Sequence, residues 1–184
     1  MQIIVWPETM RNTTARIADE IDRITAAVGR IATWCSLYIV VAEFAVVVFR
    51  YALGFGSLRL QESVLYAHAG LFMLAAAWTL QTDGHVRVDV FYAHHSERAR
   101  AAVDLLGALV FLLPFAAVLF VLTLPYVERS WRIFEGSPQP SGLPFVYLLK
   151  TVILVFASLI GLQGVAQAIR AALSLSAPSR QQPH

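Results

Sequence analysis

The chain has 184 residues, of which 58% are hydrophobic and only 14% are Asp, Glu, Lys or Arg. Soluble domains are nearer half apolar and a quarter charged, so this composition excludes an ordinary soluble enzyme and indicates a membrane protein. The net charge of +2 is too small to indicate nucleic-acid binding, and the single cysteine excludes an internal disulfide or a thiolate metal cluster.

Residues 1–30 are polar to amphipathic, because apolar side chains recur there at helical spacing while charged residues occupy the other faces. The recurring apolar residues are Ile17, Ile21, Ile24, Val28 and Ile31. This pattern predicts a helical extension of the first membrane span that lies along, or projects from, the membrane surface. A helix that docks a partner is the alternative. No cleavable signal sequence is visible, so the first span is predicted to be an uncleaved signal anchor.

Four apolar stretches follow, and each is long enough to cross a membrane. The first, Ile31 to Phe49, is interrupted only by Glu43. The other three contain no Asp, Glu, Lys or Arg and lie between Glu62 and Asp83, between Asp104 and Glu128, and between Lys150 and Arg170. A helix needs about 20 apolar residues to cross roughly 30 Å of hydrocarbon. The predicted spans are residues 31–52, 63–81, 98–127 and 145–172.

Turn and capping residues define the predicted ends of these spans. Gly54 to Ser57 break the first helix, Asp83-Gly84 stops the second, and Ser96 is the predicted N-cap of the third. Pro114 predicts a kink inside the third helix, and Pro125 predicts its end.

The predicted fold class is an all-α membrane protein with four transmembrane helices. Residues 31–173 form the transmembrane domain, a Pro- and Gly-rich loop (Glu135 to Pro144) precedes the last span, and residues 174–184 are predicted to be a disordered tail. Nine of the 14 basic residues lie on the side that holds both termini. Because cytoplasmic loops are enriched in Lys and Arg, the N- and C-termini are predicted to be cytoplasmic.

Two ionisable residues lie inside spans, Glu43 in the first and His68 in the second. Such groups are costly in the membrane and are candidates for function. We expect each to face a neighbouring helix and to be hydrogen-bonded there. A proton or ion relay is the alternative for Glu43.

The last span has small residues at contact spacing, Ala157, Gly161 and Gly164, with Gln163 and Gln167 on nearby faces. Small side chains let membrane helices approach closely, and side-chain amides can form hydrogen bonds between helices.

The five histidines raise the alternative of a redox-enzyme membrane anchor of the haem b or quinone type. A haem b site needs two imidazoles from facing helices, and only His68 lies inside a span. No cofactor is therefore predicted. No Gly-rich phosphate loop, H-E-x-x-H pair or G-x-S-x-G elbow occurs, so no enzyme activity is predicted. A stand-alone channel or pump is a third possibility, for which Glu43 and His68 would make a poor polar path.

The loop between the second and third spans alternates His85, Arg87 and Asp89 with valines. We expect an extended or short helical segment whose valines enter the membrane interface, while the three polar side chains pair with each other or with neighbouring loops. One histidine and one carboxylate are too few for a metal site.

The charges that follow the third span predict a self-paired helical turn beyond the membrane. Glu128 and Arg132 are four residues apart, and Arg132 and Glu135 are three apart. Trp131 belongs in the interfacial aromatic belt. These residues form either an anchoring collar or a docking surface for a periplasmic partner.

Several segments together resemble the small membrane subunit of tripartite ATP-independent periplasmic (TRAP) transporters. The resemblance covers most of residues 31–172. It lies in LQES (Leu60 to Ser63), the LFMLAAAWTL span, GHVRVDVFY (Gly84 to Tyr92), the RARAAVDLLG start of span three, YVERSWRIFEGS (Tyr126 to Ser137) and SGLPFVYLLK (Ser141 to Lys150).

The resemblance implies a role as a non-catalytic scaffold in the bacterial inner membrane. A large permease subunit would carry substrate and sodium by an elevator-like motion, and a periplasmic substrate-binding protein would deliver the substrate. This chain would brace the large subunit, with membrane lipids and those two proteins as its partners and organic acids such as 2-oxo acids as the substrate class. Sodium coupling would reside in the large subunit. The residues expected to form the outer-face motif and to help docking are Arg59, Glu62, Arg129, Arg132, Glu135 and Ser137.

Overall fold

The computed structural model describes residues 8–84 and 96–176, and every element within those ranges is a helix. The helices are α1 (Glu8–Tyr51), α2 (Leu58–Gln81), α4 (Glu97–Leu106), the π-helical segment η1 (Gly107–Leu112), α5 (Leu113–Arg132) and α6 (Val146–Ser176). α4, η1 and α5 form one continuous rod. This rod, α1, α2 and α6 are each long and apolar enough to cross a membrane. The predicted all-α membrane fold with four spans is confirmed.

The first helix is much longer than a membrane is thick. α1 has 44 residues, which corresponds to about 66 Å at 1.5 Å per residue, or roughly twice the hydrocarbon thickness. The amphipathic segment predicted before the first span is helical from Glu8 onward and continues into the span without a break. The helix ends at Tyr51, and Gly54 turns the chain with a φ of 69°.

The second helix begins five residues earlier than the predicted span. Ser57 caps it, because the Ser57 hydroxyl oxygen accepts a hydrogen bond from the Leu60 amide (3.4 Å). α2 ends at Gln81 as predicted, and Asp83 leaves the helix with a φ of 54°. The last helix also extends further than predicted, since α6 ends at Ser176, inside the segment assigned to the tail.

The third span begins at the predicted cap, where the Ser96 hydroxyl oxygen accepts from the Ala99 amide (3.4 Å). A kink is predicted near Pro114, and a π-helical segment, η1, ends two residues before this proline. Such segments are a common cause of helix bends. The predicted end of the helix near Pro125 is wrong, because α5 continues to Arg132. Proline removes a single backbone donor, and the turns after it bury Val127 and Ser130 (4% and 1% exposed).

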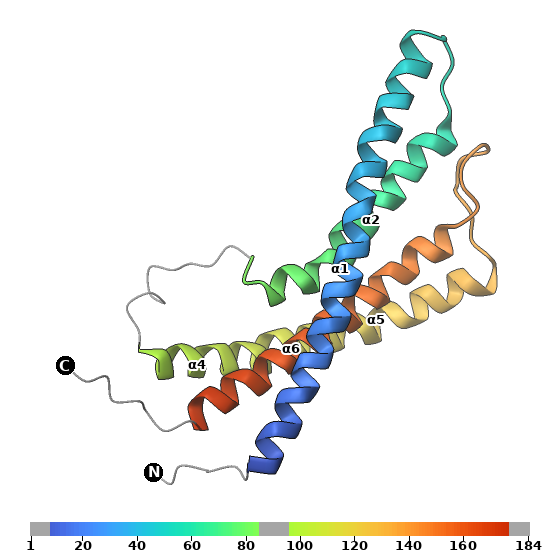
Figure 1. Ribbon diagram of the computed structural model, residues 1–184. Coiled ribbons are helices and arrows are strands. Elements are labelled where there is room, and N and C mark those ends of the chain that lie inside the picture. Colours follow the sequence, from blue (N-terminus) through green and yellow to red (C-terminus); the bar gives the residue numbers. More distant parts are fainter. Residues whose placement is uncertain (1–7, 85–95, 177–184) are drawn as a thin grey trace.

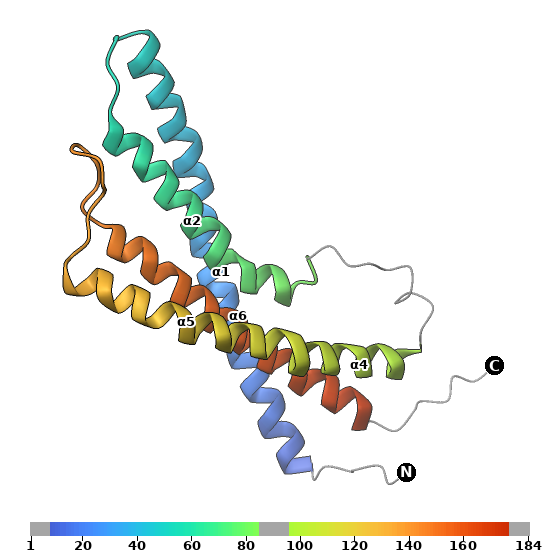
Figure 2. The same ribbon diagram turned by 180° about the vertical axis from the view of Figure 1, so that it is seen from behind.

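The helices form two antiparallel pairs that cross each other (Figure 1). α1 packs along α2, the α4–η1–α5 rod packs along α6, and α6 also contacts α1 and α2. From behind, the rod lies beside α6 along most of its length (Figure 2). α6 is therefore the central helix, and Leu159 and Ile160 pack there with Ala77 and Ala116 in the main apolar cluster.

Different segments of the chain lie at the two ends of the molecule. The α1–α2 turn and the α5–α6 loop lie at one end, which we call the loop end (Figure 1). The start of α1 and the end of α6 lie at the other, which we call the terminal end. The first and the last described helix therefore begin and end on the same side, as four spans require.

Candidate functional site

At the loop end, the carboxylate of Glu62 near the start of α2 holds the loop between α5 and α6. The Ser137 hydroxyl donates a hydrogen bond to Glu62 Oε1 (2.5 Å), and the Leu143 amide donates to Glu62 Oε2 (2.6 Å). One side chain thus joins α2 to both arms of a distant loop. We call Glu62, Ser137 and Leu143 the loop-end clasp.

The loop-end clasp is closed so tightly that residue 142 has to be glycine. A Cβ atom on Gly142 would lie 2.3 Å from Ser137 Oγ and 2.7 Å from Glu62 Oε1. The Ser137 amide also donates to the Leu143 carbonyl (2.9 Å), which pairs the two arms of the loop. The motifs LQES, EGS and SGLP, which are far apart in the sequence, therefore meet in one structure.

A second contact next to the loop-end clasp joins the loop to α6. Lys150 Nζ lies 2.5 Å from Glu135 Oε2 and 4.0 Å from the centre of the Tyr126 ring. The hydrogen bond from Lys150 holds the pKa of Glu135 below its usual value. The predicted Arg132–Glu135 pair is therefore replaced by Glu135–Lys150, because the chain turns back after α5 and brings α6 beside the carboxylate. The predicted Glu128–Arg132 pair is present (2.5 Å).

Aromatic residues pack between α5 and α6 at the same level. Trp131 donates a hydrogen bond from its indole nitrogen to Thr151 Oγ1 (2.8 Å) and meets the Tyr147 ring edge-on at 4.7 Å. Trp131 is still 41% exposed. A half-exposed indole with a hydrogen-bonded nitrogen fits the interfacial position predicted for it.

The basic residues predicted for docking all lie exposed at the loop end. Arg59 is on the first turn of α2, and Arg129 and Arg132 are on the last turn of α5. Arg129 donates from Nε to the Pro125 carbonyl (3.2 Å), and Arg132 is in the ion pair with Glu128. The three side chains thus present positive charge beside the loop-end clasp without being part of it.

Toward the terminal end, a buried polar network joins α1, α2 and α6. Gln163 is fully buried, donates from Nε2 to Asp22 Oδ1 (3.0 Å) and accepts from the Thr25 hydroxyl (3.1 Å). The Gln81 side-chain oxygen lies 3.2 Å from the same hydroxyl. Arg170 donates to the other oxygen of Asp22. We call Asp22, Thr25, Gln81, Gln163 and Arg170 the polar clamp.

The polar clamp was only partly visible in the sequence. The spacing on span four indicated that Gln163 bonds across helices, but it did not name a partner. Asp19 and Asp22 lie three residues apart on α1, and Arg170 reaches both. An acidic pair at helical spacing before span one and an arginine at the end of span four were the signal, and only the crossing of α1 over α6 reveals that they meet.

The two ionisable residues inside spans are not covered by any of the described helices. Glu43 on α1 and His68 on α2 are both exposed. The described part of the chain offers Glu43 no hydrogen-bond or ion-pair partner. The His68 ring contacts Phe72, one turn further along the same helix, at 4.9 Å. Within the described residues neither side chain faces a neighbouring helix, because α1 and α2 turn these faces outward, so the expected helix contact stays a prediction.

The predicted family-motif loop residues His85, Arg87 and Asp89 lie outside the described residues. Among the residues that are described, no group of three or more His, Cys, Asp or Glu side chains could hold a metal ion. Cys35 is half-buried in the middle of α1.

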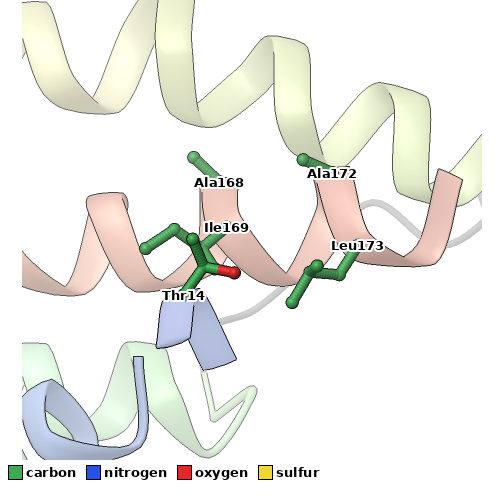
Figure 3. A pocket seen from close by; sticks show the side chains of 5 residues that line it. All are labelled: Thr14, Ala168, Ile169, Ala172 and Leu173. Atoms are coloured by element: carbon green, nitrogen blue, oxygen red, sulfur yellow. The ribbon is translucent and has the colours of Figure 1, made fainter. Parts of the chain in front are cut away.

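One pocket lies between the start of α1 and the end of α6 (Figure 3). It has a volume of about 220 Å³ and is lined by Thr14, Ala168, Ile169, Ala172 and Leu173. Its walls are apolar apart from the Thr14 hydroxyl, which donates to the Arg11 carbonyl. The lining offers neither a nucleophile nor an acid–base pair, so we assign the pocket no catalytic role.

The polar side chains of the loop-end clasp and the polar clamp are used to join helices and loops. Each carboxylate in them already accepts hydrogen bonds from protein donors. This chemistry fixes the relative positions of the spans, and it suits a structural component rather than a catalyst.

Comparison with known proteins gives a match to one family. The family described as "Tripartite ATP-independent periplasmic transporters, DctQ component" matches residues 39–174, which is well over half of the chain. No curated protein and no solved structure matches the chain. The matched range begins within α1, contains the loop-end clasp and ends two residues before the end of α6.

Proposed function

Because the chain belongs to the DctQ-component family of TRAP transporters, and is thus a small inner-membrane transporter subunit rather than an enzyme or redox anchor, we propose that it works as a scaffold. In this proposal it braces the large permease subunit and helps to receive the periplasmic substrate-binding protein. The tripartite family implies both partners. The family match over residues 39–174 carries the proposal.

The packing of the helices supports a bracing role. α6 contacts all the other helices, and the two helix pairs are joined by the loop-end clasp at one end and by the polar clamp toward the other. A unit fastened at two levels resists tilting of one helix pair against the other. An elevator-type permease needs such a stationary part, against which its moving part slides.

The exposed arginines support a docking role for the loop end. Arg59, Arg129 and Arg132 lie at the loop end. The excess of basic residues that the sequence predicts for the opposite side supports a periplasmic position for this end. This orientation places both termini in the cytoplasm. Sodium coupling belongs to the large subunit in this proposal, and the imported solute is an organic acid.

The scaffold role is tested by transport with and without this chain. The large permease subunit and the periplasmic protein of the same transporter are reconstituted in liposomes, and solute uptake is driven by a sodium gradient. We expect uptake to need this chain. Uptake at full rate by the large subunit alone would show that bracing is not its function.

A further inference from the structure

A carboxylate lies on the outside of the molecule within the apolar run of α1. Glu43 is exposed, and its exposed neighbours Val40 and Phe44 are 66% and 70% accessible. Ionisable residues within membrane spans are costly and nearly always face protein or water rather than lipid. No described residue of this chain pairs with Glu43, so a partner molecule is the natural source of the group that satisfies it.

Glu43 belongs to a line of exposed residues along α1. The line, which we call the α1 stripe, runs through Thr33, Ser36, Val40, Glu43, Val47 and Arg50, and all six are exposed. Their spacing alternates between three and four residues, which is the spacing of a helix–helix contact line in left-handed packing. The Thr33 and Ser36 hydroxyls bond to carbonyls of α1 itself (both 2.6 Å). The polar members that find no partner among the described residues are therefore Glu43, inside the apolar run, and Arg50, at its end.

The exposed face of the α4–η1–α5 rod has a different character. Its exposed residues between Asp104 and Glu128 are apolar except for the Tyr126 hydroxyl near the loop end. They include Phe111, Phe115, Val118, Val121 and Leu122. A face of this composition suits lipid chains, whereas the α1 stripe does not. The two faces therefore have different neighbours.

We propose that the α1 stripe is the contact line for a transmembrane helix of the large permease subunit, which places a cation or a hydrogen-bond donor opposite Glu43. This inference rests on the proposed function, which supplies the partner. A donor is needed because an ionised carboxylate in a low-dielectric contact is stable only when it is paired and hydrogen-bonded. Valines at every seventh position would pack against the partner helix on either side of that pair.

A second copy of this chain fits the α1 stripe poorly. Two copies in one membrane have the same orientation, so a symmetric contact along α1 pairs each residue with its own counterpart. Glu43 would then face Glu43, and two carboxylates at contact distance repel each other. Charge complementarity thus favours a different chain as the occupant.

The contact is tested by photo-crosslinking in the assembled complex. A photo-reactive amino acid replaces Val40 or Val47 on the α1 stripe, or Val118 or Val121 on α5 as matched controls, in the chain co-expressed with the large subunit of the same transporter. We expect the α1 positions to give an adduct with the large subunit and the α5 positions to give none. Adducts only from α5, or dimers of this chain from α1, would overturn the inference while leaving the proposed function standing. Failure of the large subunit to co-purify with the wild-type chain would overturn both.

Substitution of the carboxylate provides a second measurement. Glu43→Ala leaves the partner's donor unpaired, and we expect the amount of co-purified large subunit to fall at least about tenfold, while Glu43→Gln, which can still accept a hydrogen bond, loses less. Val121→Ala serves as the control and should retain the large subunit. Equal recovery with Glu43→Ala and the wild-type chain would show that Glu43 has no partner in the complex.

Discussion

At the scale of single residues, two carboxylates fasten the helices to one another at two levels. Glu62 closes the loop end, and Asp22 anchors the polar clamp between α1 and α6. Both carboxylates are tolerated in a largely apolar molecule because each receives two hydrogen bonds. Removing a donor or acceptor from such a group leaves its partner without a hydrogen bond, which costs more than the bond itself contributed.

Asp22→Asn should destabilise the molecule through the polar clamp. The substitution removes the charge that Arg170 faces, and hydrogen bonds to charged groups contribute about 1.5–3 kcal/mol. Because the site is only partly buried, we expect the free energy of unfolding to fall by about 1–2 kcal/mol. The measurement is the shift of Tm in detergent, followed by tryptophan fluorescence.

Glu20→Gln is the matched control for Asp22→Asn. Glu20 pairs with Arg23 on the exposed face of α1, where both side chains are more than 60% accessible. Surface pairs of this kind contribute at most about 1 kcal/mol. If Asp22→Asn shifted Tm no more than Glu20→Gln, the polar clamp would not be a stabilising contact.

Gly142→Ala should disrupt the loop-end clasp. The new methyl group would lie 2.4 Å from Ser137 Cβ, so the loop has to shift, and overpacking of this kind costs about 1–3 kcal/mol. Tm reports the change. Gly136→Ala in the same loop meets its nearest atom at 3.4 Å, which is ordinary contact, and should be tolerated. Equal effects of the two substitutions would contradict the geometry described for the loop-end clasp.

The Glu135–Lys150 contact should make stability depend on pH. The pKa of Glu135 is lowered in the folded chain by the hydrogen bond from Lys150, so the contact stabilises the fold above the ordinary carboxyl pKa. That contribution is lost as the pH falls from about 4.5 through the lowered folded value.

Glu135→Gln removes the titrating group and is the variant to compare. The wild-type chain should have the higher Tm at neutral pH, and the difference between the two Tm values should shrink in acid. A difference that stayed constant down to about pH 3 would exclude this carboxylate as its source.

At the scale of the elements, the crossing of α1 over α2 depends on one position. A Cβ atom on Gly29 would lie 2.5 Å from Trp78 Cβ and 2.7 Å from Trp78 Cε3. The helices can approach this closely only because Gly29 has no side chain. Gly164 has a similar role on α6, where a Cβ atom would lie 3.1 Å from Leu112 Cδ2.

Gly29→Ala should push α1 away from α2 and lower Tm, at a cost of about 1–3 kcal/mol. Gly107→Ala is the control, since no atom lies within 4 Å of the added methyl group. Alanine is the better helix former by about 1 kcal/mol, so the control should be neutral or stabilising. Changes in Tm of opposite sign for the two substitutions would separate the effect of packing from that of helix propensity. A Gly29→Ala substitution that raised Tm would contradict the close crossing.

The elements were largely predictable from the sequence, and their junctions were not. Long apolar stretches, three of them free of charge and the first interrupted only by Glu43, located all four spans, and Ser96 marked the start of the third helix, because both signals are local. Pro125 misled the prediction, since a single lost hydrogen bond was outweighed by packing of the next turns on α6. Glu135 was predicted to form an ion pair with Arg132, because sequence spacing cannot reveal that the chain folds back and brings Lys150 beside it.

The candidate site was likewise predictable from local sequence signals, and not where it depends on how the helices pack. Glu62 and Ser137 were selected from motifs by resemblance, but their hydrogen bond spans 75 positions and depends on how α2 meets the α5–α6 loop. Thr25 and Asp22 were not selected, because their importance comes from the crossing of α1 and α6. Glu43 was recognised as unusual, and the outward orientation of its face came from the packing of the helices.

At the scale of the whole molecule, the exposed arginines at the loop end allow a test of docking. Reversing the charge of Arg59 and Arg129 should weaken binding of the periplasmic substrate-binding protein to the membrane complex, and the effect should be greatest at low salt, because exposed charges are screened over about 10 Å at 0.1 M.

The matched control for the docking test is charge reversal of Arg16, which lies on α1 toward the terminal end. Binding is measured with the complex in nanodiscs at several salt concentrations. The same loss at every salt concentration, or an equal loss for the control, would show that the arginines at the loop end do not steer the docking partner.

The unbroken course of α1 has a mechanical consequence. A rigid helix that is held where it crosses its neighbours pivots about that crossing, so its two arms move together and in opposite directions. A sideways push on the arm that carries residues 8–25 is therefore felt at the tip near Tyr51, without any hinge to absorb it. Whatever holds one arm still also holds the other.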